Sequence, residues 1–145
     1  MICFEELLSR NGSFAYKTKG KSMEPLLRQN RDIVVIRTVS RRLKPLDVAF
    51  YRRGSQYILH RVIADKGDSY LVRGDNTYVT ETVPDQDVLG ILTGGQRKGK
   101  AFSVYQPAYS VYSFFWTLIY PVRWVAFRSK RLAGKAARKL GWRHE

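Results

Sequence analysis

Two short stretches of the chain place a serine and a histidine in settings that suit nucleophilic catalysis. Ser22 lies two residues after Gly20 and three before Pro25, so a flexible glycine and a helix-stopping proline hold it on a bend. His60 interrupts the apolar, β-branched run at 57–63, which is typical of a strand. A serine hydroxyl becomes a strong nucleophile only when a base removes its proton. The imidazole of His60 is the base that we expect.

Two carboxylates are candidates for the third member of such a site. Asp75 ends a strand in the turn Gly74-Asp75-Asn76, where the backbone fixes its position. Glu81 follows six residues later, in a stretch for which the sequence predicts no secondary structure. A carboxylate beside His60 would orient the imidazole and hold its pKa near or above the usual value of about 6.5. We expect Asp75 to take this role, with Glu81 as the alternative acid.

Several stretches, in this order along the chain, resemble the signal-peptidase superfamily of serine peptidases, and most closely its archaeal and endoplasmic-reticulum branch. They cover about residues 13 to 95 and are Gly20-Lys21-Ser22-Met23-Glu24-Pro25, Asp32-Ile33-Val34-Val35, Asp47-Val48-Ala49-Phe50, Leu59-His60-Arg61-Val62-Ile63, Gly74-Asp75-Asn76 and Val88-Leu89-Gly90-Ile91-Leu92.

The resemblance has implications for mechanism, fold and substrate. It implies a Ser-His pair, because that branch has a histidine where the bacterial branch has a lysine base. It implies an antiparallel, coiled β-sheet peptidase domain of the signal-peptidase and LexA type. It also implies a preference for small side chains just before the cleaved bond. The family's second aspartate, after the Gly-Asp-Asn turn, corresponds in position to Glu81 here.

The rest of the first hundred residues predicts the elements that position these groups. Short apolar segments between Gly and Pro turns predict strands at 13–19, 32–37, 47–51, 56–64, 69–73 and 88–92, which together make one mainly antiparallel β domain over residues 1–100. A short helix is expected to begin near Phe4, and the single cysteine, Cys3, to be buried in its first turn. Residues 1–10 have two glutamates and no long apolar run, which predicts neither a signal peptide nor a membrane span.

Residues 101–145 differ in composition from the domain before them. The stretch 101–122 has no charged residue and is rich in aromatic side chains, and residues 123–145 then contain eight basic residues and one acidic residue. This tail carries half of the net charge of +14. Aromatic side chains beside a basic helix are typical of a segment that settles on an anionic membrane surface, and 101–122 is a marginal span. The alternative is that the aromatic segment packs on the β domain and the basic helix is solvated.

Together these observations favour a membrane-associated serine endopeptidase that cleaves a leader or signal segment from an extended peptide or precursor protein. Ser22 would attack the scissile carbonyl, His60 would transfer the proton, and Asp75 would orient the imidazole. The sequence implies no cofactor and has no metal-ligand spacing, and nucleic acid is disfavoured because the tail has no recognisable reading motif. The alternatives are a self-cleaving regulator of the LexA type and a catalytically silent module that docks peptides at a membrane.

Overall fold

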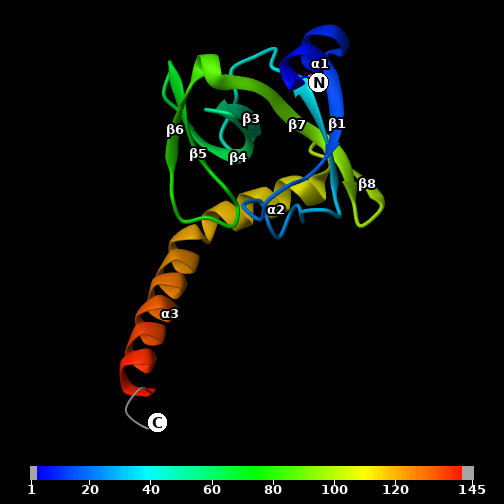
Figure 1. Ribbon diagram of the computed structural model, residues 1–145. Helices are drawn as coiled ribbons and strands as arrows, with labels where there is room; N and C mark the ends of the chain where they lie inside the picture. Colours follow the sequence, from blue (N-terminus) through cyan, green and yellow to red (C-terminus); the bar gives the residue numbers. More distant parts are fainter. Residues whose placement is uncertain (1–2, 142–145) are drawn as a thin grey trace.

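The chain folds as a curled antiparallel sheet with one helix before it and two helices after it (Figure 1). The computed structural model describes residues 3–141. Their elements are α1 (Phe4–Asn11), β1 (Ser13–Lys17), β2 (Ile33–Thr38), β3 (Val48–Arg53), β4 (Gln56–Asp65), β5 (Ser69–Arg73), β6 (Glu81–Pro84), the 3-10 helix η1 (Asp85–Asp87), β7 (Val88–Arg97), β8 (Lys100–Ser103), α2 (Pro107–Leu118) and α3 (Tyr120–Gly141). The strand order is β1-β2-β7-β3-β4-β5-β6, and β8 pairs with β7. The predicted mainly antiparallel β fold is confirmed.

Strands β1 to β5 and β7 lie where the sequence predicts strands, whereas β6 and β8 are additional. Glu81 of β6 lies opposite Val72 of β5, and β8 extends from Lys100 to Ser103 along β7. The domain boundary expected between residues 100 and 101 therefore falls inside β8, and the appendage begins after Ser103. Cys3 is exposed rather than buried, because it precedes the first turn of α1.

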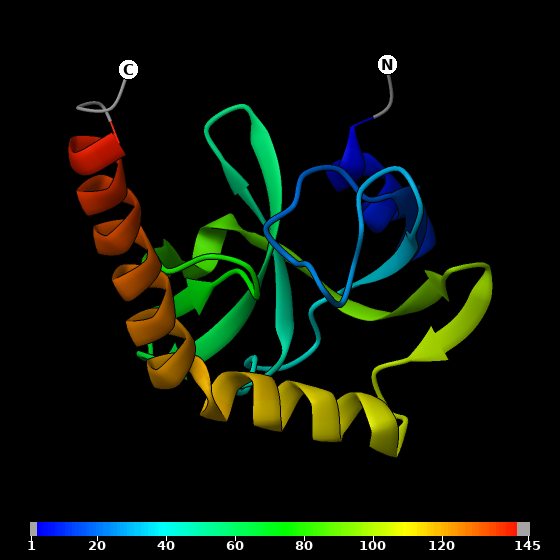
Figure 2. The ribbon, with the colours of Figure 1, turned by 90° about the horizontal axis from the view of Figure 1, so that it is seen from below.

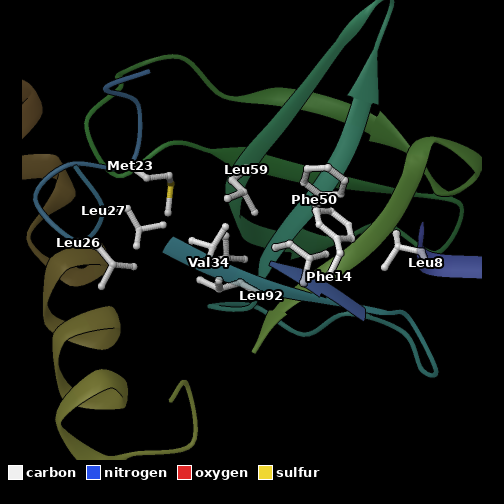
Figure 3. Close-up of a cluster of buried hydrophobic side chains, with 11 residues drawn as sticks. Leu8, Phe14, Met23, Leu26, Leu27, Val34, Phe50, Leu59 and Leu92 are labelled. Atoms are coloured by element: carbon white, nitrogen blue, oxygen red, sulfur yellow. The ribbon is translucent and has the colours of Figure 1, made fainter. Parts of the chain in front are cut away.

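Apolar side chains pack on both faces of the curled sheet. Phe14, Phe50 and Leu92 belong to a cluster that Met23 and Leu27, from the loop after β1, also join (Figure 3). A second cluster lies on the other face and contains Tyr51, Val62, Tyr70, Val72 and Val83. Because the residues just after Ser22 are anchored in the first cluster, the position of the Ser22 loop is set by the core. Met23 is itself buried beneath that loop.

The two C-terminal helices differ in how they meet the domain. Helix α2 lies across the sheet domain, and α3 then projects away from it (Figure 1). The view from below shows the bend between the two helices (Figure 2). Tyr109 and Tyr112 of α2 pack against the first apolar cluster. The first part of α3 stacks Phe127 on Tyr78, with ring centroids 4.3 Å apart. Within residues 3–141, none of the helices has both the length and the apolar character that a membrane crossing requires.

Candidate active site

Ser22 lies on a tight turn between β1 and β2. Gly20, just before it, has a φ of 81°, a conformation that glycine adopts without steric cost. The Glu24 amide donates to the Lys21 carbonyl oxygen at 3.2 Å and closes the turn around the serine. Lys21, directly before the serine, is exposed. Ser22 lines a cavity of about 520 Å³ together with His60.

The turn after β5 is hydrogen-bonded to the Ser22 loop. The Asn76 amide donates to the Ser22 carbonyl oxygen at 2.8 Å, and the Asn76 side chain donates to the Lys21 carbonyl oxygen at 3.1 Å. A β-carbon added at Gly74 would lie 2.5 Å from the Ser22 carbonyl oxygen and 3.1 Å from Cδ2 of His60. A side chain at position 74 would therefore push the serine loop and the imidazole apart. Glycine at this position lets the two approach each other.

The buried imidazole of His60 has different neighbours on its two edges. Its Nδ1 lies 3.1 Å from the Tyr51 hydroxyl and 3.6 Å from Oε1 of Glu81. The opposite edge, at Cδ2 next to Nε2, faces Gly74 and the serine loop. Burial, together with the positive charge of Arg53, lowers the pKa of His60 to about 4. The expected pKa near or above 6.5 is therefore wrong, because the cost of burying an imidazolium exceeds the stabilisation that the negative charge of Asp75 returns.

Glu81 is the carboxylate that faces this imidazole. Cross-strand pairing puts Glu81 opposite Val72 and Val72 opposite Val62, so Glu81 lies on the same face of the sheet as His60. Its Oε2 accepts a hydrogen bond from Arg53 at 2.7 Å. Its Oε1 is buried and accepts no hydrogen bond from the residues that the structure describes, and burial raises the pKa of the carboxyl. One oxygen of Glu81 is thus available to the Nδ1 proton.

Asp75 faces a different partner. Its two carboxylate oxygens accept hydrogen bonds from Nε and Nη2 of Arg61, each at 2.8 Å, and both side chains are almost fully buried. The Tyr112 hydroxyl of α2 donates to the same carboxylate at 2.8 Å. The Trp116 indole and the Arg123 guanidinium donate to the main-chain oxygen of Asp75 at 2.8 and 3.0 Å. The structure therefore places Ser22 and His60 on one cavity, with no hydrogen bond between them among residues 3–141, and places Glu81 beside the imidazole. It places the Asp75 carboxylate on Arg61 instead of on the imidazole.

Sequence reasoning missed the residues that hold these carboxylates, and one signal for them was present. Arg61 stands inside an apolar strand run, and a buried arginine requires a buried acceptor. Alternation along β4 puts Arg61 and His60 on opposite faces, so they need different partners. Tyr51 and Arg53 are two residues apart on β3 and share the face of His60, because Ala49 pairs with His60. The roles of Tyr112 and Trp116 depend on how α2 docks, for which the sequence contains no comparable signal.

Comparison with known proteins addresses the family. The Peptidase S24-like family model matches residues 3–94, which is more than half of the chain and includes Ser22, His60, Asp75 and Glu81. No curated protein matches the chain significantly. The matched family lies in the superfamily of LexA and the signal peptidases, so the predicted superfamily is confirmed, and its serine peptidase fold agrees with the curled sheet. The chain belongs to the Peptidase S24-like family.

Proposed function

We propose that the protein is a serine endopeptidase in which Ser22 is the nucleophile and His60 is the general base. The observation that carries this proposal is the shared cavity, in which the imidazole has the serine loop on one edge and the Tyr51 hydroxyl as a hydrogen-bond partner on the other. For Nε2 to accept a proton, Nδ1 must hold the ring proton and donate it. The Tyr51 hydroxyl and Oε1 of Glu81 are acceptors near Nδ1.

The mechanism follows from this orientation of the ring. The Ser22 hydroxyl oxygen attacks the carbonyl carbon of the scissile bond while Nε2 of His60 takes its proton, and the imidazolium returns that proton to the leaving amine. Water, activated in the same way, then hydrolyses the acyl-enzyme. Glu81 stabilises the transient imidazolium. The main-chain amides of Ser22 and Met23 are the oxyanion donors, since neither donates to another group in the described part of the chain.

Asp75 is a positioning residue in this proposal. Its ion pair with Arg61 and its bond from Tyr112 fix the turn that carries Gly74 and Asn76, and Asn76 in turn holds the Ser22 carbonyl oxygen. The buried pair thus acts on the nucleophile through the main chain. Its effect on catalysis is indirect, because the carboxylate has no hydrogen bond to the imidazole within residues 3–141.

The proposed substrate is an extended peptide, such as the leader or signal segment of a precursor protein. β1 is at one end of the strand order, and the chain that leaves it leads directly to Ser22. A peptide laid along this edge would add a strand and bring a carbonyl group to the serine. Aromatic side chains from Phe4, Tyr16 and Tyr57 line the same cavity. They favour an apolar stretch in the bound peptide.

The family match favours one alternative, cleavage of the protein's own chain, and one experiment separates the possibilities. A mixture of proteome-derived peptides is incubated with wild type, Ser22→Ala and Ser55→Ala, and new peptide ends are identified by mass spectrometry. Ser55 is an exposed turn serine and serves as the matched control. We expect new ends with wild type and Ser55→Ala, and none with Ser22→Ala. Ends that arise only within the protein itself would establish self-cleavage. An absence of any cut, with no labelling of Ser22 by a phosphonate probe, would contradict the peptidase proposal.

A further inference from the structure

The C-terminal helices have two opposite faces. The inner face packs on the β domain, where Tyr112, Trp116 and Arg123 bind Asp75. The outer face carries large apolar side chains that are between 52% and 70% exposed, namely Val111, Phe114, Phe115, Leu118, Val122 and Val125. On α2, Val111, Phe115 and Leu118 are three or four residues apart, with Phe114 beside Phe115, and on α3 Val122 and Val125 are three residues apart, so each helix presents its members on one side. We call these six residues the outer stripe. An exposed apolar stripe of this length indicates a surface with a partner.

Charge identifies the class of partner. Residues 101–141 contain seven basic residues and no acidic residue. One of them, Arg123, is bound to Asp75 on the inner face. The other six are exposed along α3, which continues from the outer stripe: Arg128, Lys130, Arg131, Lys135, Arg138 and Lys139. A surface that is apolar in one part and strongly basic in the next is suited to a layer with an apolar interior and anionic headgroups.

We propose that the outer stripe and the basic side chains of α3 bind the surface of an anionic membrane. A second copy of the chain would bring two strongly positive helices together, and nucleic acid would leave the outer stripe in water. An anionic membrane surface can bury the apolar outer stripe and also attract the positive charge of α3. The projection of the later part of α3 away from the domain supports this choice, since its exposed basic side chains are free to contact a surface (Figure 1). The proposal does not rest on peptidase activity.

Because the inner face of α2 packs on the β domain, the position of the candidate active site relative to the membrane follows from the structure. Helix α2 separates the outer stripe from the turn at Asp75, and a helix with its side chains is about 10 Å across. The turn that holds Ser22 would therefore stand roughly one helix diameter above the lipid surface. Peptide segments that lie at the interface would meet the cavity at that height. The membrane would thus select substrates by their position.

Vesicle flotation with the full chain tests the proposal. Vesicles of phosphatidylcholine alone are compared with vesicles that also contain phosphatidylglycerol, at low and at high salt. We expect the protein to float with the anionic vesicles, and salt to weaken the binding because it screens the basic side chains. Ser22→Ala should bind as wild type does, so a failure of binding is distinguishable from a failure of the peptidase proposal.

Two sets of variants test whether binding depends on these particular side chains or only on the overall charge and hydrophobicity of the protein. Replacing Lys130, Lys135 and Lys139 by Gln should weaken binding on the order of 100-fold, whereas the same change at the exposed residues Lys17, Lys44 and Lys66 removes equal charge and should have little effect. Phe115→Gln with Leu118→Gln should weaken binding at least about tenfold, and Val79→Gln, an exposed apolar residue outside the stripe, should not.

Several results would overturn the proposal. Equal losses from the two lysine sets would show that only overall charge matters. Equal binding to neutral and anionic vesicles, or no binding at low salt, would also contradict it. Light scattering tests whether a second copy of the chain covers the outer stripe instead. If wild type is a dimer and the Phe115→Gln, Leu118→Gln variant is a monomer, this face is an interface between two copies of the chain.

Discussion

Neighbouring residues of β4 show two ways in which a buried cation or base can meet a carboxylate. His60 faces Glu81, which is partly exposed and has one oxygen without a hydrogen-bond partner in residues 3–141. Arg61 faces Asp75, which is buried and accepts hydrogen bonds on both oxygens. A carboxylate whose oxygens are already bonded stabilises a fixed structure. A carboxylate with an unused oxygen can respond when a proton arrives on the imidazole. We therefore expect the two faces of β4 to respond differently to mutation.

The largest expected effect is on the catalytic face. Ser22→Ala and His60→Gln should each lower kcat by on the order of 10⁶, and the double variant should be hardly worse, because the two residues act as a unit. Steady-state kinetics on a peptide found in the cleavage screen give the measurement, and circular dichroism checks that both variants stay folded. Substantial activity in His60→Gln would mean that another group is the base.

The next effect separates the carboxylates by activity. Glu81→Gln should lower kcat by up to about 10⁴-fold, the loss seen when a triad carboxylate is neutralised, with little change in the free energy of unfolding. From the sequence alone, Asp75→Asn would be expected to cost more activity than Glu81→Gln. From the structure we expect the opposite ranking for folded protein, because Glu81 faces Nδ1 and Asp75 does not. If Glu81→Gln keeps full activity, Tyr51 alone orients the ring.

The third effect separates the same carboxylates by stability. Asp75→Ala leaves the charge of Arg61 buried without its partner, which should lower the free energy of unfolding by about 3–5 kcal/mol. Glu81→Ala removes a partly exposed group and should lower it by less than about 1 kcal/mol. Urea denaturation followed by tryptophan fluorescence measures both. Combining Asp75→Leu with Arg61→Met should restore much of the loss, since no uncompensated charge then remains.

The smallest effect is on pH dependence. Because the pKa of His60 is about 4 in the folded protein and about 6.5 when unfolded, the unfolded chain binds more protons in this window, so stability falls as the pH drops through it. The contribution of His60 to the free energy of unfolding is at most about 3 kcal/mol. The raised pKa of Glu81 has the opposite effect, because a carboxyl whose pKa is raised on folding makes stability fall as the pH rises. His60→Gln should remove the contribution of His60 from urea titrations at pH 4 to 7. Cleavage by wild type should stay high down to about pH 5. A half-maximal rate near pH 6.5 would contradict the burial of the imidazole.

The parts of the site that the sequence predicted depend on local patterns. A glycine, a serine and a proline within six residues determine a bend, and alternation around His60 determines a strand. The partners of these residues depend on pairing between strands far apart in the chain. β6 has four residues, of which only Val83 is buried, so no periodicity indicates that it carries Glu81 to His60. Aromatic residues such as Tyr112 and Trp116 are compatible with membrane and core alike, and only the docked helix shows that they bind Asp75.

The bond between α2 and the turn at Asp75 also orders events during synthesis. A ribosome makes the chain from the N-terminus, so Ser22, His60 and Asp75 leave the exit tunnel well before Tyr112 and Trp116. Until α2 and the start of α3 follow, the Asp75 carboxylate lacks the donor Tyr112, and its main-chain oxygen lacks Trp116 and Arg123. The turn that supports the serine loop is therefore completed only after these helical residues have been made. A nascent chain would therefore carry the reacting groups before the helices that support them have emerged.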